Sequence, residues 1–249
     1  MAALDEIIAF LDDLLDPGAF SDYGPNGLQV PGAAAVNTVA TGVSAGARLF
    51  ERAAEAGADL VLVHHGLFWS GPPRPLDRAA KRRLQLLFEH DMSLAAYHLP
   101  LDAHPAHGNN ALLAAALGCD RWEPFAGIGM VGWLPEDGIA VAELIDRTRH
   151  ATGGREPVVF TGGPEHIRSI GIVSGGGSPY LGEAIELGLD AFLTGEPVER
   201  VMNQADEAGI HFLAAGHYAT ETHGVRRLGA LVAERFGVEH VWLDVPNPI

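Results

Sequence analysis

The sequence predicts an α/β protein with two lobes, built from two partly duplicated strand–helix–strand units. Short strand-like apolar runs alternate along the chain with segments of helical periodicity, which favours largely parallel sheets covered by helices. The same order of elements occurs twice within 249 residues. Apolar residues make up 47% of the chain and charged residues 19%, a composition typical of a globular protein with a sizeable core.

The N-terminal segment, residues 1–16, is predicted to form an amphipathic helix. Its apolar residues recur at helical spacing, namely Leu4, Ile7, Ile8, Leu11 and Leu15. The segment is acidic and lacks the basic start of a signal peptide, and no apolar run approaches transmembrane length. Cys119 is the only cysteine, which excludes a disulfide framework and cysteine-based zinc sites. We therefore expect a cytoplasmic protein without a membrane partner.

A first pair of similar segments spans residues 39–67 and 170–197. Both read as a strand, a small-residue turn, a helix, Gly-x-Asp, a second strand and a polar loop. Gly57 and Gly188 stand where glycines end helices, and the run from Leu60 to Val63 has strand character. The two segments thus predict the same local structure.

A second pair of similar segments spans residues 94–118 and 213–237. Each reads as a short buried strand, then His-x-x-x-carboxylate, then an apolar helix. His98 and Asp102 align with His217 and Glu221 at a constant offset. Agreement of two segments in the same order argues for an internal duplication.

Residues 119–169 lie between the two copies. They contain a turn-rich stretch with hairpin-like strands, followed by a helix from about Val141 to Ala151. We place a boundary near Pro124, which gives a first lobe of residues 1–124 and a second lobe of residues 125–249. The metal site described next is expected between these lobes.

Histidine and carboxylate residues collect at the carboxyl ends of the predicted strands, where open α/β sheets bind their ligands. The strand from Val61 to Val63 runs into His64 and His65. The next predicted strand runs into His98 and Asp102, and a strand of the second copy runs into His217 and Glu221. If these strands are neighbours, their ends form one cluster of imidazoles and carboxylates.

Imidazole and carboxylate ligands without thiolate suit Zn, Mn, Fe, Co or Ni. Successive strand side chains diverge, so His64 and His65 serve two metal ions more easily than one, and Gly66 allows a sharp exit after them. A carboxylate can bridge two ions at roughly 3.5–4 Å separation. Histidines after a strand can also be structural or solvated, but their joint occurrence in a duplicated context favours a pair of divalent metal ions.

Three further features allow more than one interpretation. His104, His107 and His223 lie near the motifs, and we interpret them as capping or entrance residues rather than ligands. The glycine-rich turn from Ser174 to Ser178 could hold an anion, although the absence of a following Lys-Ser/Thr favours a simple tight turn. The segment from Asp22 to Val30 has loop composition and receives no function from physical arguments.

The net charge of −16 argues against nucleic acid and anionic lipid as partners. A local pocket could still bind an anionic small molecule, for example a nucleotide.

Five motifs resemble a known family over essentially the whole chain: NGLQV, VLVHHGLFW, AAYHLPLDAH, TGEP and AAGHYATETHGVRRL. The chain resembles the Nif-three-like dinuclear-metal-centre proteins, also called GTP cyclohydrolase I type 2 homologues. It departs from the family pattern mildly, in Pro25-Asn26 before Gly-Leu-Gln and in the residues that follow Asp102.

The resemblance implies a two-lobed protomer that assembles as a toroidal homohexamer. It implies that the metal ligands are His64, His65, Asp102, His217 and Glu221, with Glu221 as a bridge. It places His98 beside the metal site, where it could shuttle protons, act as a sixth ligand or orient Asp102.

The family name implies a metal-dependent hydrolase in which water attacks purine C8 of GTP, and a pair of metal ions can activate that water. The same site would serve a phosphoesterase or an amidohydrolase equally well. A different class of function, a non-catalytic metal-binding scaffold or protein-interaction module, also remains open at this stage.

Overall fold

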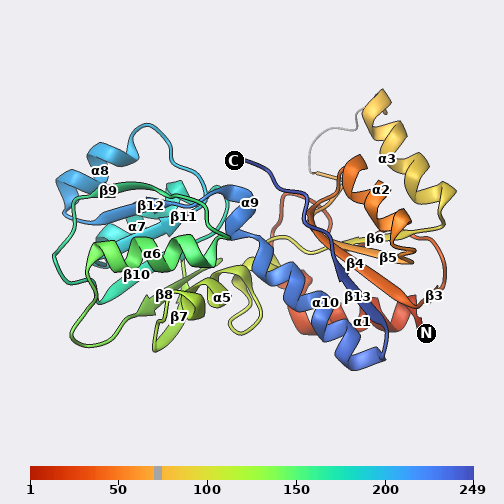
Figure 1. Ribbon diagram of the computed structural model, residues 1–249, viewed down its shortest axis with the longest axis horizontal. Coiled ribbons are helices and arrows are strands. Elements are labelled where there is room, and N and C mark those ends of the chain that lie inside the picture. Colours follow the sequence, from red (N-terminus) through yellow and green to blue (C-terminus); the bar gives the residue numbers. More distant parts are fainter. Residues whose placement is uncertain (70–74) are drawn as a thin grey trace. The chain divides into compact units, whose positions relative to one another are not determined.

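The structure is a computed structural model that describes residues 1–69 and 75–249 (Figure 1). It confirms the mixed α/β fold class, and the chain forms two compact units. Unit 1 consists of Met1–Leu101 and Gly224–Val245, and unit 2 consists of Asp102–His223 and Pro246–Ile249. The boundary expected near Pro124 lies inside unit 2, because β7 (Arg121–Phe125) pairs in antiparallel register with β8 (Gly129–Trp133).

Unit 1 is built on a sheet with the strand order β13-β4-β5-β6-β2. The central strands β4 (Thr38–Ser44), β5 (Leu60–His65) and β6 (Ser93–Ala96) are parallel to one another. β2 (Gly27–Val30) pairs antiparallel with β6, and β13 (Glu239–Trp242) pairs parallel with β4. A separate small ribbon joins β1 (Ala2–Ala3) to β3 (Ala35–Val36).

Helices cover both faces of this sheet. α2 (Ala47–Glu55) and α3 (Arg78–Glu89) lie on one face, and α1 (Leu4–Leu15) and α10 (Thr222–Phe236) lie on the other (Figure 1). A short 3₁₀ turn, η1 (Pro17–Ala19), follows α1. The predicted N-terminal helix is confirmed, since its stripe of leucines and Ile7 is buried.

The two-sided cover explains the continuous apolar run of β5. Val61 and Val63 belong to the same buried cluster as Phe50 of α2. Leu60 and Leu62, whose side chains alternate to the opposite face, are equally buried. A parallel strand buried on both faces reads in sequence as an unbroken apolar segment.

Unit 2 is built on a sheet with the strand order β7-β8-β10-β11-β12-β9. The strands β10 (Ser169–Val173), β11 (Ala191–Thr194) and β12 (His211–Ala214) are parallel, and β9 (Val158–Thr161) pairs antiparallel with β12. The hairpin predicted between the two copies is confirmed as β7 and β8.

The unit 2 sheet also has helices on both faces. α5 (Asn109–Ala116) and α6 (Val141–Ala151) share one buried cluster with β10, and α7 (Leu181–Glu186) and α8 (Val201–Ala208) share another with β11 and β12. α6 begins and ends where it was predicted. The remaining elements are η2 (Ser178–Tyr180), α9 (His217–Thr220) and α4 (Leu99–Ala103), within which the chain passes from unit 1 to unit 2.

The internal duplication is visible in both sheets. β4, β5 and β6 form a parallel set in unit 1, and β10, β11 and β12 form one in unit 2. In each unit an antiparallel strand, β2 or β9, pairs with the last member of the set. Gly57 and Gly188 follow corresponding helices with φ of 66° and 65°, a left-handed conformation that favours glycine.

The Gly-x-Asp motif performs the same task in both copies. Asp59 accepts hydrogen bonds from the backbone N–H groups of residues 37–38, where β4 begins. Asp190 accepts equivalent bonds from the N–H groups of residues 168–169, where β10 begins. The repeated aspartate therefore secures the start of the neighbouring strand.

In the described part of the chain, no helix is both long enough and apolar enough to cross a membrane.

Candidate metal centre

Unit 1 carries a cluster of three imidazoles, His64, His65 and His98, which we call the histidine cluster. The ring centroids lie 4.6 Å apart for His64 and His65, 5.0 Å for His64 and His98, and 5.5 Å for His65 and His98. One ring nitrogen of each histidine lies within 4.8 Å of one in each of the others. The three side chains can therefore present nitrogen ligands to a shared cation.

The strand β5 differs from its predicted length. The sequence placed His64 and His65 after the strand, whereas both are its last two residues, because Ser44 of β4 still pairs with His65. The rings of these adjacent residues nonetheless lie close together at the strand end. Gly66 follows immediately, and a Cβ on it would displace the side-chain amide of Gln29, which is hydrogen-bonded to Pro25 and Leu67.

Each ring of the histidine cluster is held through its Nδ1 atom. His64 is fully buried, and its Nδ1 donates to the Tyr97 carbonyl oxygen at 3.0 Å. The Nδ1 of His65 is hydrogen-bonded to Ser44 Oγ at 3.1 Å, and the His98 Nδ1 lies 2.7 Å from Asp22 Oδ1. Histidines that bind metal are commonly held in this way, by a protein oxygen at the nitrogen that does not face the ion.

Asp22 is a partner of the candidate site that the sequence did not predict. It lies in the loop before β2 and is almost completely buried, with a side chain that is 3% exposed. Burial by itself raises the pKa of Asp22, but hydrogen bonds from His98, Asn26 and Leu99 outweigh burial and lower the pKa to about 2. A loop rich in glycine and proline gives no spacing signal that would connect Asp22 with a histidine far along the chain.

Unit 2 carries a second group, Asp102, His217 and Glu221, which we call the acidic cluster. α9 begins at His217, and the helical turn brings His217 Nε2 within 3.2 Å of Glu221 Oε1, as the i, i+4 spacing predicted. A carboxylate oxygen of Asp102 lies within 4.8 Å of one of Glu221. Asp102 and Glu221 are 5% and 3% exposed, so two buried carboxylates lie close together here.

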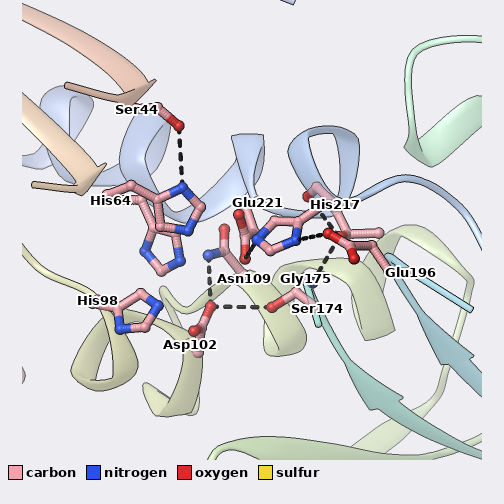
Figure 2. A network of polar contacts seen from close by, with 12 residues as sticks. Ser44, His64, His98, Asp102, Asn109, Ser174, Gly175, Glu196, His217 and Glu221 are labelled. Atoms are coloured by element: carbon pink, nitrogen blue, oxygen red, sulfur yellow. Dashed lines mark hydrogen bonds and ion pairs between the residues drawn. The ribbon is translucent and has the colours of Figure 1, made fainter. Parts of the chain in front are cut away.

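His217 lies between two carboxylates of unit 2. Its Nδ1 is hydrogen-bonded to Glu196, in the loop after β11, while its Nε2 faces Glu221 (Figure 2). Burial by itself lowers the pKa of His217, but Glu221 and Glu196 together outweigh it and raise the pKa to about 9. The negative charges of Glu196 and Glu221 therefore favour a positive charge between them. Without a metal, the protonated His217 ring supplies that charge.

The sequence reasoning did not single out Glu196, although the repeat contains a signal for it. Alignment of the two Gly-x-Asp motifs, Gly57 to Asp59 with Gly188 to Asp190, places Glu196 opposite His65. The position of the candidate ligand His65 in the first copy is therefore occupied in the second copy by Glu196, the hydrogen-bond partner of His217.

Asp102 is oriented by two donors from its own unit. The Asn109 Nδ2 group donates to Asp102 Oδ1 at 2.8 Å, and the Ser174 hydroxyl donates to the same oxygen at 3.0 Å (Figure 2). Asn110 in turn accepts the Ser174 N–H group at 2.7 Å, which holds the serine in place. These bonds fix the orientation of the Asp102 carboxylate.

The glycine-rich turn after β10 supports the acidic cluster. The N–H groups of Ser174 and Gly175 donate to Asn110 and to Thr220 Oγ1, so both are engaged by side chains, in agreement with a tight turn rather than an anion cradle. Gly175 has a φ of 59°, and a Cβ on it would overlap Glu221 Oε1 and lie 3.1 Å from His217 Nε2. A larger residue at position 175 would displace the Glu221 and His217 side chains.

The donor atoms fit a divalent metal ion. Unit 1 offers three imidazoles and unit 2 offers two carboxylates and an imidazole, a nitrogen and oxygen set that suits Zn, Mn, Fe, Co or Ni. Among the described residues, His104, His107 and His223 belong to no group that could hold a metal. The His104 and His107 rings stack on each other, and His223 Nε2 is hydrogen-bonded to the Ala151 carbonyl oxygen.

Comparison with known proteins covers the whole chain. Relatives from Pseudomonas aeruginosa and Escherichia coli, both named GTP cyclohydrolase 1 type 2 homolog, are 43% and 42% identical over 99% and 98% of this chain and 98% of their own length. The crystal structure of TTHA1606 from Thermus thermophilus is 39% identical, with a TM-score of 0.93 over 100% of both chains. A solved structure described as protein ybgI, of unknown function, is 38% identical with the same TM-score. The family model Duf34/NIF3 (NGG1p interacting factor 3) matches residues 2–248, and the chain belongs to this family.

Proposed function

We propose that the chain is a metal-dependent hydrolase that holds two divalent metal ions. The proposed ligands are His64 and His65 of unit 1 and Asp102, His217 and Glu221 of unit 2, with Glu221 as the bridging carboxylate. One observation carries the proposal: the rings of His64, His65, His98 and His217 are all hydrogen-bonded through Nδ1 to a protein oxygen. Three of these four histidines are proposed ligands, and their shared anchoring atom matches the way proteins orient imidazoles toward a metal.

A bound divalent ion lowers the pKa of a coordinated water and polarises a substrate oxygen, which is the chemistry of hydrolysis at neutral pH. The residues around the site would orient the side chains that hold this ion. Asn109 and Ser174 hold the Asp102 carboxylate, and Glu196 holds the His217 ring. Because Glu221 and Glu196 raise the pKa of His217 to about 9, His217 would have to give up its proton in order to bind a metal.

His98 is proposed as the group that moves a proton. Its Nδ1 is engaged by Asp22, so the lone pair of the neutral ring lies on Nε2, which can take a proton from the attacking water and return it to the leaving group. Its side chain is 18% exposed. Asp102 already has Asn109 and Ser174 as partners, which argues against the alternative that His98 orients this carboxylate.

The support for a substrate class is the names of the relatives. A relative that is 43% identical carries the name GTP cyclohydrolase 1 type 2 homolog, and on that basis we propose a purine nucleotide as the first substrate to test. Water would add at C8 of the purine and the ring would open. Phosphate esters and cyclic amides are the competing substrate classes.

The test is a substrate screen on metal-reconstituted protein, with the metal content measured before and after. The panel contains GTP, other nucleotides, phosphate esters and cyclic amides. Turnover that depends on metal, and that His98→Gln reduces by about 10²–10⁴-fold without loss of metal, supports the proposal. Loss of metal in His98→Gln would make the residue a ligand. Full metal content without turnover on any class would contradict a hydrolase and favour a non-catalytic metal-binding scaffold.

We also propose that the chain assembles as a toroidal homohexamer. The support is the family resemblance together with relatives that match over 98% of their length, so this chain contains the same elements that such relatives would use for assembly.

A further inference from the structure

The loop between η1 and β2 holds His98 by its backbone and by its ring. Asn26 Oδ1 accepts the His98 backbone N–H at 2.7 Å, and Asp22 Oδ1 lies 2.7 Å from the His98 Nδ1. Asp22 is far from His98 in sequence, yet both belong to unit 1. The loop thus brings a buried carboxylate to one specific nitrogen of one histidine.

The two oxygens of Asp22 have different tasks. Oδ2 accepts the Asn26 side-chain amide and the Leu99 backbone N–H, each at 2.9 Å, and these bonds secure the chain. Oδ1 accepts the N–H of the adjacent Tyr23 and bonds the His98 ring. The bonds that Oδ2 accepts would be enough for an aspartate that only secures the chain. The bond between Oδ1 and the imidazole therefore requires another explanation.

Ring contacts alone cannot select the working nitrogen of His98. Tyr23 and Trp69 lie edge-on to the His98 ring, with centroids 6.0 Å and 5.3 Å away. Such contacts restrict the plane of the ring, but they do not distinguish Nδ1 from Nε2. A carboxylate at Nδ1 does distinguish them, because an ionised carboxylate only accepts hydrogen bonds and so requires the proton to be on Nδ1.

The second copy contains the same arrangement built from a different segment. The repeat aligns His98 with His217, and His217 also has a carboxylate, Glu196, at its Nδ1. Glu196 lies after a central strand of unit 2, whereas Asp22 lies before the edge strand of unit 1. Two unrelated segments therefore supply the same kind of group to corresponding histidines, which indicates that the Nδ1 carboxylate matters to the site.

We infer that Asp22 is a positioning residue that keeps the His98 proton on Nδ1, so that Nε2 presents its lone pair to the histidine cluster. This inference rests on the proposed function for the role of His98, but the position of the proton is a property of the protein alone. An asparagine at position 22 could either accept from or donate to Nδ1, so it would no longer specify the tautomer.

The experiment is ¹⁵N NMR of the histidine side chains in Asp22→Asn and in the unchanged protein, with His98→Gln used to assign the His98 signals. In the metal-free protein, at a pH where the spectra show a neutral His98 ring, we expect its proton to be on Nδ1 only, and Asp22→Asn to show a mixture of tautomers. With a verified substrate, kcat of Asp22→Asn should fall by about 10–100-fold, while the metal content stays the same.

The matched control is Asp59→Asn, in the same unit. Asp59 also secures backbone N–H groups but lies at the start of β4, so its substitution should lower the thermal midpoint without changing the His98 tautomer. A His98 tautomer that is unchanged in Asp22→Asn, or changed equally in Asp59→Asn, would overturn the inference. An absence of turnover in the unchanged protein would count against the hydrolase proposal alone, because the NMR result does not depend on it.

Discussion

At the scale of single residues, the histidines of the candidate site depend on partners that share no motif. The four histidine rings are held at Nδ1 by a backbone carbonyl, a hydroxyl and two carboxylates, from Tyr97, Ser44, Asp22 and Glu196. Each partner comes from a different segment of the chain, but the atom that it holds is the same. The common feature is therefore a geometric requirement on the imidazole and not a sequence pattern.

Gly175 provides a direct test of how closely the acidic cluster is packed. Gly175→Ala places a methyl group against Glu221 Oε1, closer than van der Waals contact allows and at a φ of 59°, so Glu221 must move. We expect a loss of stability of about 1–2 kcal/mol from the left-handed backbone and a metal affinity lower by about 10–100-fold. Calorimetric metal titration and thermal unfolding measure the two effects.

Gly176→Ala is the matched control for this substitution. A Cβ on Gly176 meets no atom within 4 Å, and its φ lies outside the left-handed region. Stability and metal affinity should stay close to those of the unchanged protein. Equal effects of the two alanines would show that the turn, rather than the contact with Glu221, is responsible.

The charge on His217 predicts how the metal-free protein responds to pH. The folded pKa of about 9 lies above the ordinary value of 6.5, so the protonated ring stabilises the fold fully below pH 6.5. That contribution is lost as the pH rises through about 9. The thermal midpoint measured in chelator should therefore fall across this range.

Glu196→Gln provides the comparison, because it removes one of the two charges that raise the pKa of His217. Its thermal midpoint should depend less on pH over the same range. An unchanged pH dependence would mean that Glu196 does not contribute to the pKa of His217.

At the scale of elements, the sequence predicted those that have a periodic signal. Five apolar residues at helical spacing predicted α1, and four of them are buried. The helix from Val141 to Ala151 was predicted with its observed ends. Gly57 and Gly188 marked two helix ends because the backbone there is left-handed, a conformation that favours glycine. The end of β5 was predicted too early, since pairing with β4 extends the strand through two polar residues that have no strand-like character.

The parts of the candidate site that the sequence did not predict also lack a periodic signal. His217 and Glu221 were found because a helical turn joins them, and His98 because the repeat aligns it with His217. Asp22 and Glu196 act through contacts between distant segments, which neither periodicity nor local spacing encodes. Of these two residues, only Glu196 has a sequence signal, because the repeat aligns it with His65.

At the scale of the whole molecule, each unit contains parts of both copies. Most of α10, which ends the second copy, belongs to unit 1 together with the strand β13 that follows it. The segment that follows His98 and Asp102, including α5, belongs to unit 2. Neither copy by itself therefore holds the complete core of a unit, and residues 1–124 lack β13 and α10.

The proposed hexamer gives a simple prediction for the mass in solution. Light scattering at micromolar concentration should give six times the chain mass of 26.3 kDa. A monomer or dimer under the same conditions would contradict the assembly, while leaving the ligand proposal untouched.

The measurement that tests the central claim most directly is the metal content of the unchanged chain and of Glu221→Ala, after reconstitution and removal of excess metal. The unchanged chain should retain about two ions, as a dinuclear centre requires. Glu221→Ala should lose most of both, because a bridging carboxylate contributes to each ion. Glu207→Ala, a substitution at an exposed position of α8, is the control and should retain both.

Thermal unfolding of Glu221→Ala without metal should remain cooperative, since Glu221 lies at the end of α9 and outside the apolar clusters of unit 2. Two ions in the unchanged chain, two in Glu207→Ala and few in a folded Glu221→Ala are the results that our proposal predicts. No bound metal in the reconstituted unchanged chain, or two ions retained by Glu221→Ala, would contradict it.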